Sequence, residues 1–412
     1  MPSAARAAEP TISLGSLETT IDEAPGLEAA LRHIDATEKA EGVAGARSGL
    51  DYLFDAGFGP RNDIVSNTEN NTTVRYAQSA GIQLPLLGTA IAQQNAIGAA
   101  RTDESLARIA YAEERRDRIA QLRNAYALFW QYGRQREIAE HYAQAFSSEL
   151  RAARALRRNG FWTEGNLLDF LDALGRFNTD VRTLRTSQRT QLTAISAALG
   201  RDVGPFRAIE PVLGAACVPK RADAIRSAAE IDPTLAKIAA ETDRLTSQVQ
   251  RVRGSSIDAS AQVATGTVFD LLPPRVGYSL TVGLNVGLPT HARSEERALR
   301  DELAAQVDEQ NLLGVQRRAE ISAAIDGALD ELANARDDLA QATRNEASKR
   351  EDLREAVVRF HTLSQSGAGS FNDVQTTLAE LFDAENATAI ARGTVYLKAS
   401  ALFLLAPNAC DG

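Results

Sequence analysis

Histidines and cysteines, the residues most often used for metal binding and nucleophilic catalysis, are few and widely spaced in this sequence. The histidines are His33, His141, His291 and His361, and none has metal-ligand spacing to a cysteine or to a carboxylate pair. The sequence contains no G-x-S-x-G, P-loop or H-E-x-x-H motif. Gly367-Ala368-Gly369 is an isolated G-x-G that follows no strand pattern, so it predicts no nucleotide-binding loop. We therefore expect no enzyme activity, no metal site and no cofactor.

Two aspartates stand out instead, because they occupy matching places in the two halves of the chain. Asp169 and Asp373 are separated by 204 residues, and the same offset separates Leu84-Pro85 from Leu288-Pro289. The order of strand-like and helix-like segments also repeats, which is typical of a tandem duplication. Asp169, Asp172 and Asp373 all follow the start of an expected helix, where a carboxylate can simply complement the helix dipole.

Each half begins with two segments in which apolar residues alternate with polar or small ones. The first two segments cover residues 50–58 and 72–87 and flank a turn-rich stretch, and the other two cover residues 256–269 and 276–288. Strict alternation predicts strands with one apolar and one polar face. The alternating runs are about 9–13 residues long, which suits a tilted strand that crosses a membrane. A soluble hairpin packed on helices would show the same pattern, but two hairpins at matching points of a repeat favour the membrane.

A long helical segment follows each pair of strands. Residues 90–158 and residues 292–363 contain no proline, and each segment contains only two glycines. Apolar residues recur about every seven positions, as at Leu332 and Leu339, which predicts coiled-coil packing. Each long helix then reverses at a turn of small residues, and we expect returning helices over residues 166–200 and 371–406.

The four expected strands constrain the architecture. The longest apolar stretch near the C-terminus, residues 399–406, is far shorter than the ~20 residues of a membrane-spanning helix. Four strands cannot close a barrel, which needs about eight, and open strand edges are not tolerated in lipid. We therefore expect a mainly α chain with a small β part, in which three copies supply about twelve strands to one β-barrel. The long helices would form an α-helical barrel beneath it, so that the assembly is a tube.

Taken together, these features resemble the TolC family of outer-membrane efflux channels of Gram-negative bacteria. The resemblance covers roughly residues 15–406 and includes the repeat, the junctions from strand to Leu-Pro, and the helices after the turns. Those helices begin Leu167-Leu168-Asp169-Phe170 and Asn372-Asp373-Val374-Gln375. The short chain and short linker are most similar to the cation-efflux, CusC-like branch.

The resemblance implies a homotrimer with a β-barrel in the outer membrane and a helical barrel in the periplasm. It also implies a periplasmic adaptor, or membrane-fusion protein, which docks on the helix-turn tips and links the tube to an inner-membrane pump. The tip residues in this sequence are Asn159, Gly160, Phe161, Ser366, Gly367 and Gly369. An acidic ring at the tip aperture is implied as well, and Asp169, Asp172 and Asp373 are at the matching positions. Thr376 stands where some members have a further aspartate, so the second repeat would contribute a weaker ring.

The two cysteines, Cys217 and Cys410, each follow the end of a repeat. In the TolC family both segments lie in the belt around the helical barrel, and the periplasm permits disulfides. The resemblance therefore implies a disulfide between Cys217 and Cys410.

We divide the chain into two repeats that are joined by a linker. Residues 1–14 are either a disordered arm or the small-residue remnant of a signal peptide. The divisions that follow are a first repeat at 15–200, a linker at 201–220, a second repeat at 221–406 and a tail at 407–412.

Composition excludes one class of partner and leaves two alternative functions open. The chain has 45 Lys and Arg residues against 54 Asp and Glu residues, a net charge of −9, which offers no basic face for nucleic acid. A type I protein-secretion exit duct would have the same fold as an efflux channel. A coiled-coil scaffold outside the membrane would explain the long helices alone. The sequence does not identify the transported substrate, which could be a small solute or a metal cation.

Overall fold

The computed structural model describes residues 10–66, 69–211, 218–271, 274–363, 371–407 and 409. The chain forms two compact units, each assembled from segments that are distant in the sequence. Unit 1 comprises Met1–Ala29, Tyr111–Asp232 and Arg318–Gly412, and unit 2 comprises Ala30–Ala110 and Pro233–Arg317. Each unit therefore contains segments from both halves of the chain.

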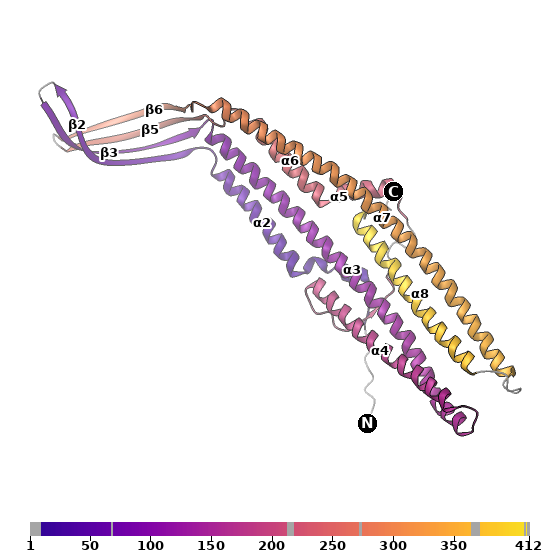
Figure 1. Ribbon diagram of the computed structural model, residues 1–412. Coiled ribbons are helices and arrows are strands. Elements are labelled where there is room, and N and C mark those ends of the chain that lie inside the picture. The colour runs from indigo at the N-terminus through magenta and orange to yellow at the C-terminus, as the bar shows by residue number, and fades with distance from the viewer. Residues whose placement is uncertain are drawn as a thin grey trace, which may run out of the picture. The chain divides into compact units, whose positions relative to one another are not determined.

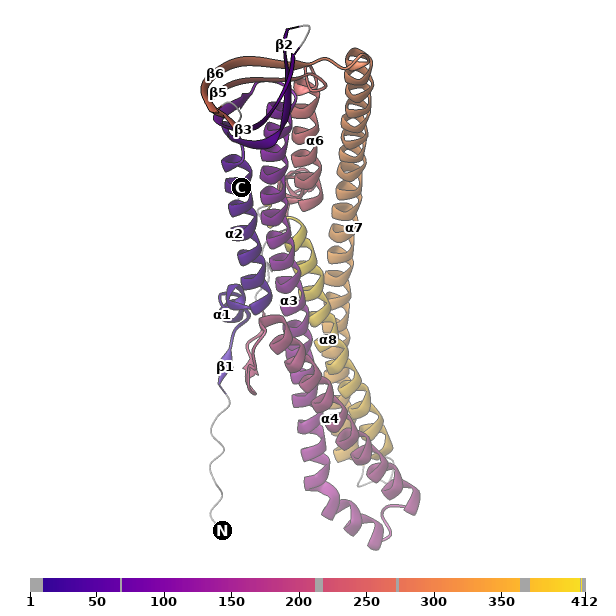
Figure 2. The ribbon, with the colours of Figure 1, turned by 90° about the vertical axis from the view of Figure 1, so that its left-hand side faces the viewer.

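Helices make up most of the described residues. They are α1 (Leu14–Glu18), α2 (Pro25–Ala46), α3 (Thr89–Arg158), α4 (Glu164–Leu199), α5 (Arg221–Ile231), α6 (Pro233–Arg251), α7 (Ala292–Leu363) and α8 (Phe371–Leu405), with a 3-10 turn, η1, at Ile21–Glu23. The strands are β1 (Thr11–Ile12), β2 (Asp51–Ser66), β3 (Glu69–Pro85), β4 (Arg207–Ala208), β5 (Asp258–Leu271) and β6 (Pro274–Gly287). In unit 1, α8 lies beside the C-terminal half of α7, and α4 lies beside the end of α3 (Figure 2).

The long strands of unit 2 form one antiparallel sheet in the order β2-β3-β5-β6 (Figure 1). Strand β3 from the first half of the chain pairs directly with β5 from the second half. The turn-rich stretch expected after residue 58 is shorter than predicted, because the ladder between β2 and β3 continues through the pair Pro60↔Val74. Strand β2 is an edge strand, where a proline is tolerated because its missing N–H need not face a neighbour.

Several elements were not expected from the sequence. No helix was predicted at α2, α5 or α6, and residues 1–14 were expected to be an arm or a signal-peptide remnant. The structure shows that Thr11 and Ile12 pair in parallel with Arg207 and Ala208, so part of that segment is ordered. A two-residue strand carries no periodicity, which is why only the tertiary structure reveals this pairing.

Tyr126 fixes the small β1–β4 sheet to α3. Its side chain is fully buried, and its hydroxyl lies 2.7 Å from the carbonyl oxygen of Ile12 and 2.8 Å from that of Ile209. The hydroxyl has one hydrogen to share between these two carbonyl oxygens. Ile12 belongs to β1, and Ile209 directly follows β4. Burial raises the pKa of Tyr126 to about 12, because the phenolate would lose its hydration.

We expect Tyr126→Phe to cost about 1–2 kcal/mol of unfolding free energy at neutral pH, because two partly buried hydrogen bonds to carbonyls are lost. The variant should also lose less stability than the native protein when the pH is raised into the alkaline range. In the native protein the raised pKa stabilises the fold below pH 10, and this contribution disappears as the pH rises from about 10 towards about 12. Urea unfolding of the native protein and the variant at pH 8 and pH 11 measures both effects. A variant that loses as much stability in alkali as the native protein would contradict this explanation.

One helix in the described part of the chain, α8, is long and apolar enough by length and composition alone to cross a membrane. No such segment was expected from the sequence. The apolar residues Phe382, Ala389 and Tyr396 of α8 are nevertheless buried in unit 1. Phe382 contacts Tyr142 of α3 and Phe177 of α4, so we assign α8 to the helical packing of unit 1.

Candidate functional site

The sheet of unit 2 has one apolar face that is open to the surroundings. Tyr52, Ile82, Val263 and Val282 form one cross-strand row on this face, because the register pairs each with the next. Tyr52 is 88% exposed and Val282 is 73% exposed, and the face also carries the following exposed apolar residues: Phe54, Phe58, Tyr76, Phe269, Val276, Tyr278 and Leu280. An exposed apolar surface that extends over four strands indicates contact with a partner or a membrane.

The opposite face of the sheet is small and polar. The row next to Val282 consists of Leu53, Gly81, Ala264 and Thr281. Charged residues on this face include Asp51 and Asp55 of β2. The two faces therefore match a sheet with lipid on one side and water on the other.

Polar side chains that interrupt the apolar face are hydrogen-bonded to each other. Gln78 Nε2 donates to Thr267 Oγ1 at 3.0 Å, and the Tyr76 hydroxyl donates to Gln78 Oε1 at 3.2 Å. Mutual pairing lowers the cost of placing these groups in an apolar environment. The interruption is thus compatible with a membrane-facing surface.

An ion pair joins the two hairpins on the polar face. Arg75 of β3 and Asp270 of β5 are cross-strand partners. Arg75 Nε donates to Asp270 Oδ1 at 2.7 Å, and Arg75 Nη2 donates to Oδ2 at 3.2 Å. This bidentate geometry is specific, and it connects the two halves of the chain at the β3–β5 junction.

The two edges of the sheet are β2 and β6. In the single chain the outer backbone groups of an edge strand have no ladder partner. Lipid offers no replacement for such hydrogen bonds, so a sheet of this kind can enter a membrane only if further strands complete it.

The second candidate region is the reversal from α3 to α4 in unit 1. Gly160 has a φ of +76°, and its N–H donates to the carbonyl of Arg157 at 3.1 Å, while Phe161 N–H donates to Leu156 O at 3.0 Å. These two bonds form a Schellman motif, which ends α3 and requires a residue that accepts a positive φ. Asn159 N–H continues the helical pattern to Ala155 O at 3.0 Å.

The side chain of Thr163 begins the returning helix. Its Oγ1 accepts the backbone N–H of Asn166 at 3.2 Å, as expected for a helix N-cap. The neighbouring Phe161 is 76% exposed. An exposed aromatic residue at the end of a helical hairpin is suited to contact another protein.

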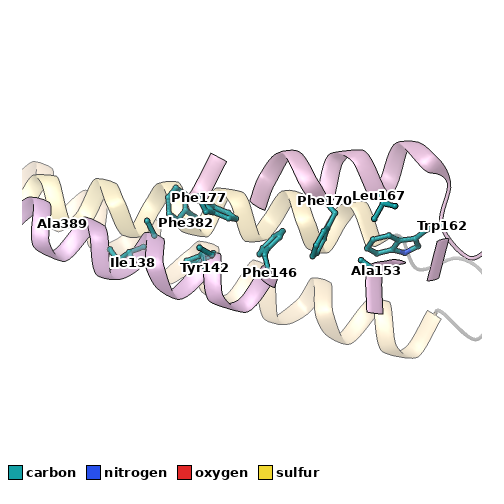
Figure 3. Close-up of a cluster of buried hydrophobic side chains, with 12 residues drawn as sticks. Ile138, Tyr142, Phe146, Ala153, Trp162, Leu167, Phe170, Phe177, Phe382 and Ala389 are labelled. Carbon is teal, nitrogen blue, oxygen red and sulfur yellow. The ribbon is translucent and has the colours of Figure 1, made fainter. Parts of the chain in front are cut away.

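An aromatic cluster, the tip core, supports this reversal (Figure 3). Phe146 stacks on Phe170 with ring centroids 4.9 Å apart, and Trp162 lies 6.0 Å from Phe170. Farther along the helices, Phe177 lies 5.1 Å from Phe146 and 4.8 Å from Phe382 of α8. The tip core thereby holds α3, α4 and α8 together.

The three candidate aspartates are all exposed, and Asp169 is found at a cavity. Asp169 and Asp172 lie on α4, and Asp373 lies in the first turn of α8. A cavity of about 330 Å³ is lined by Asp169 from α4 and by Thr376 from α8, among other residues. The structure therefore places Asp169 beside Thr376, the position at which the resemblance suggested a weaker second ring.

Some predicted site residues lie outside the described residues. In the sequence, Ser366, Gly367 and Gly369 fall between α7 and α8, Cys217 falls between β4 and α5, and Cys410 follows α8. The docking role of the glycines and the Cys217–Cys410 disulfide stay predictions.

Ion pairs near the tip connect helices that are distant in the sequence. These pairs were not expected from the sequence. Arg176 of α4 pairs with Asp383 of α8 at 2.8 Å, and Arg350 of α7 pairs with Glu385 of α8 at 3.2 Å. The pKa of Asp180 is raised, mainly by burial. The nearby charge of Asp383 adds to this rise, and the charge of Arg176 opposes it. No sequence spacing reveals such pairs, because their members are far apart in the chain.

Among the residues that the structure describes, no group of three His, Cys, Asp or Glu side chains could hold a metal ion.

No protein-family model matches this chain, and no curated protein matches it by sequence. Solved structures do resemble it. CusC matches with a TM-score of 0.76 at 13% identity, over 98% of this chain and 94% of CusC. VceC from Vibrio cholerae matches with a TM-score of 0.73 at 13% identity, over 95% of this chain and 96% of VceC. The open state of MtrE from Neisseria gonorrhoeae matches with a TM-score of 0.68 at 13% identity, over 95% and 88% of the two chains.

All three are TolC-family outer-membrane channels. At this level of identity the similarity establishes the fold. The expected fold class, a mainly α chain with a small β part of the TolC type, is confirmed.

Proposed function

We propose that this chain, which has the fold of the TolC-family outer-membrane channels, is the outer-membrane subunit of a tripartite efflux system. Three copies would form a tube that conducts small solutes or metal cations out of the cell. A periplasmic adaptor and an inner-membrane pump would supply the substrate. The assignment places the protein in the outer membrane of a Gram-negative bacterium, with its helices in the periplasm.

The two-faced sheet is the observation that carries this proposal. Its apolar face continues across all four strands, from Tyr52 of β2 to Val282 of β6. Packing the sheet on helices would bury that face, yet these side chains are exposed in the single chain. The two open edges require further strands, and three copies would bring the total to about twelve, which suits a closed membrane barrel.

The α3–α4 reversal supports the docking part of the proposal. The Schellman motif at Gly160 fixes the chain path, and Phe161 remains exposed at the turn. The tip core makes the hairpin rigid, so that a partner would meet a preorganised surface. We infer that Asn159, Gly160 and Phe161 belong to the adaptor-docking surface, together with Ser366, Gly367 and Gly369 of the second turn.

Fractionation of cells that express the gene with its upstream region tests the proposal. We expect the protein in the outer-membrane fraction, and a detergent-extracted species with the mass of three 44.3 kDa chains. A soluble monomer or dimer would overturn the channel proposal and favour a coiled-coil scaffold.

We also propose that Asp169, Asp172 and Asp373 ring the tip aperture. Each chain contributes three carboxylates, so a trimer would concentrate negative charge at the narrowest point of the tube. We expect Asp→Asn changes at all three positions to reduce the preference of the channel for K⁺ over Cl⁻. The reversal potential in a planar bilayer under a KCl gradient measures this preference.

The matched control for the aperture is Asp35→Asn, which removes an exposed carboxylate from α2. A reversal potential that is the same in the triple variant, the control and the native channel would show that the three aspartates do not line the aperture.

A further inference from the structure

A polar cavity of about 640 Å³ lies within unit 1, between α3, α4, α8 and the segment that contains β4. We call it the β4 cavity. Its volume falls within the range of roughly 300–1,000 Å³ that is usual for small-molecule sites. No role for this region follows from the sequence or from the proposed function.

Aromatic side chains form the buried part of the β4 cavity. Phe129 and Phe206 are each 3% exposed and have ring centroids 4.7 Å apart, and Trp130 is 9% exposed. All three residues line the cavity. Because so little of each ring is exposed, they offer a narrow apolar surface against which a flat ring can lie.

At the mouth of the cavity, two arginines share a single carboxylate. Arg134 Nη1 lies 3.1 Å from Glu137 Oε2, and Arg207 Nη2 lies 3.0 Å from Glu137 Oε1. Each carboxylate oxygen therefore serves one guanidinium group. The two arginines retain several N–H donors and an excess of one positive charge.

A similar excess occurs at Glu140, which also lines the β4 cavity. Glu140 is shared by Arg136 at 3.4 Å and Arg185 at 3.6 Å. Arg136 Nη1 donates to Gln188 Oε1 at 2.6 Å, and the buried Arg136 Nε lies 3.4 Å from Glu140 Oε1 without making a hydrogen bond to it. A single carboxylate thus serves both Arg136 and Arg185.

The overall charge of the lining is positive. Four arginines and three glutamates line the β4 cavity, and Arg185 competes for one of these glutamates. The glutamate farthest along the chain, Glu210, pairs with Arg392 at 3.6 Å and accepts a hydrogen bond from the Tyr396 hydroxyl. Three carboxylates thus neutralise five guanidinium groups only in part.

We propose that the β4 cavity binds an organic anion that carries an aromatic ring, such as an aromatic carboxylate. The carboxylate would bind Arg134 and Arg207 at the mouth, because guanidinium groups match carboxylate oxygens in pairs. The ring would pack on Trp130 and the neighbouring phenylalanines. This site does not depend on the channel function, because all of its residues belong to one chain.

Isothermal titration of the detergent-solubilised full-length protein with 2-naphthoate tests the site. We expect saturable binding of 2-naphthoate, and no saturable binding of 2-naphthylmethanol, which has the ring without the charge, or of acetate, which has the charge without the ring. The double variant Arg134→Gln/Arg207→Gln should weaken the binding of 2-naphthoate by roughly tenfold, as expected for loss of charge-assisted hydrogen bonds.

The variant Glu137→Gln provides the sharpest test, because it should change affinity in the opposite direction. It removes the carboxylate that competes for Arg134 and Arg207, so 2-naphthoate should bind several times more tightly than to the native protein. A merely structural role for Glu137 would give weaker binding instead. Arg201→Gln is the matched control, since Arg201 is half-exposed, pairs with Glu23 and does not line the cavity.

Three outcomes would overturn the proposal. They are the absence of saturable binding of 2-naphthoate, equal binding of 2-naphthoate and 2-naphthylmethanol, and weaker binding by the Glu137→Gln variant. Thermal unfolding of each variant shows whether it is folded as the native protein is. A failure of the channel proposal would appear as loss of the outer-membrane trimer, and it would leave these titrations interpretable.

Discussion

Val282→Arg should abolish the outer-membrane trimer, whereas Thr281→Arg, at the adjacent residue of the same strand, should leave it intact. Val282 lies on the apolar face of the sheet and is 73% exposed in the single chain. An arginine on the lipid face of a membrane barrel costs about 2–4 kcal/mol near the midplane, and a trimer would contain it three times. The trimer band in detergent extracts of the outer membrane measures the effect.

Thr281 provides a matched control because it points to the opposite face. Its cross-strand partner is Ala264, and the same row contains Gly81, so the polar face has room for a longer side chain. If the two arginine variants assembled equally well, the apolar face of the sheet would not be a lipid-facing surface. If only Thr281→Arg failed, the assignment of the two faces would be reversed.

Phe177→Ala should cause the largest loss of stability in the helical part of the protein. Phe177 is 2% exposed, and its ring centroid lies 5.6 Å from that of Tyr142, 5.1 Å from that of Phe146 and 4.8 Å from that of Phe382 (Figure 3). Truncation of a buried phenylalanine typically costs about 3–5 kcal/mol, through lost apolar burial and the cavity that remains. Urea unfolding followed by tryptophan fluorescence measures this loss.

The control for this change is Leu168→Ala on the same helix. Leu168 is 56% exposed, so its removal should change the unfolding free energy by less than about 0.5 kcal/mol. Because Phe177 joins α3, α4 and α8, its loss should also expose Trp162 to quenchers added to the folded protein. A Phe177→Ala variant as stable as Leu168→Ala would show that the tip core does not hold these helices together.

The local elements of this fold could be predicted from sequence because each has its own periodicity. Alternation from Val276 to Leu288 revealed both the strand and its apolar face, since side chains point to opposite faces of a strand at every residue. The absence of proline over residues 90–158 predicted a helix that the structure shows as Thr89–Arg158. The reversal at Gly160 was predicted because a positive φ favours glycine.

Other elements were missed for different reasons. Helix α6 has apolar residues at helical spacing, as at Leu235, Ile238 and Leu245, and this signal was overlooked. Helix α2 buries only Leu27 among its described residues, so its sequence has no continuous apolar stripe. Strand β1 has two residues, and its parallel pairing with β4 brings together segments almost 200 residues apart. Such contacts depend on the packing of α3, because the hydroxyl of Tyr126 on that helix contacts a carbonyl beside each strand.

The sequence by itself determined the long strands, the longest helices and the two faces of the sheet, because these follow from the spacing of neighbouring residues. Only the tertiary structure decided which side chains of separate elements come together. It placed Asp169 beside Thr376, paired Arg75 with Asp270, and gathered Arg134 and Arg207 around Glu137. The physical reason is that periodicity specifies which face of an element is apolar, whereas the contacts of a polar side chain depend on how distant elements pack.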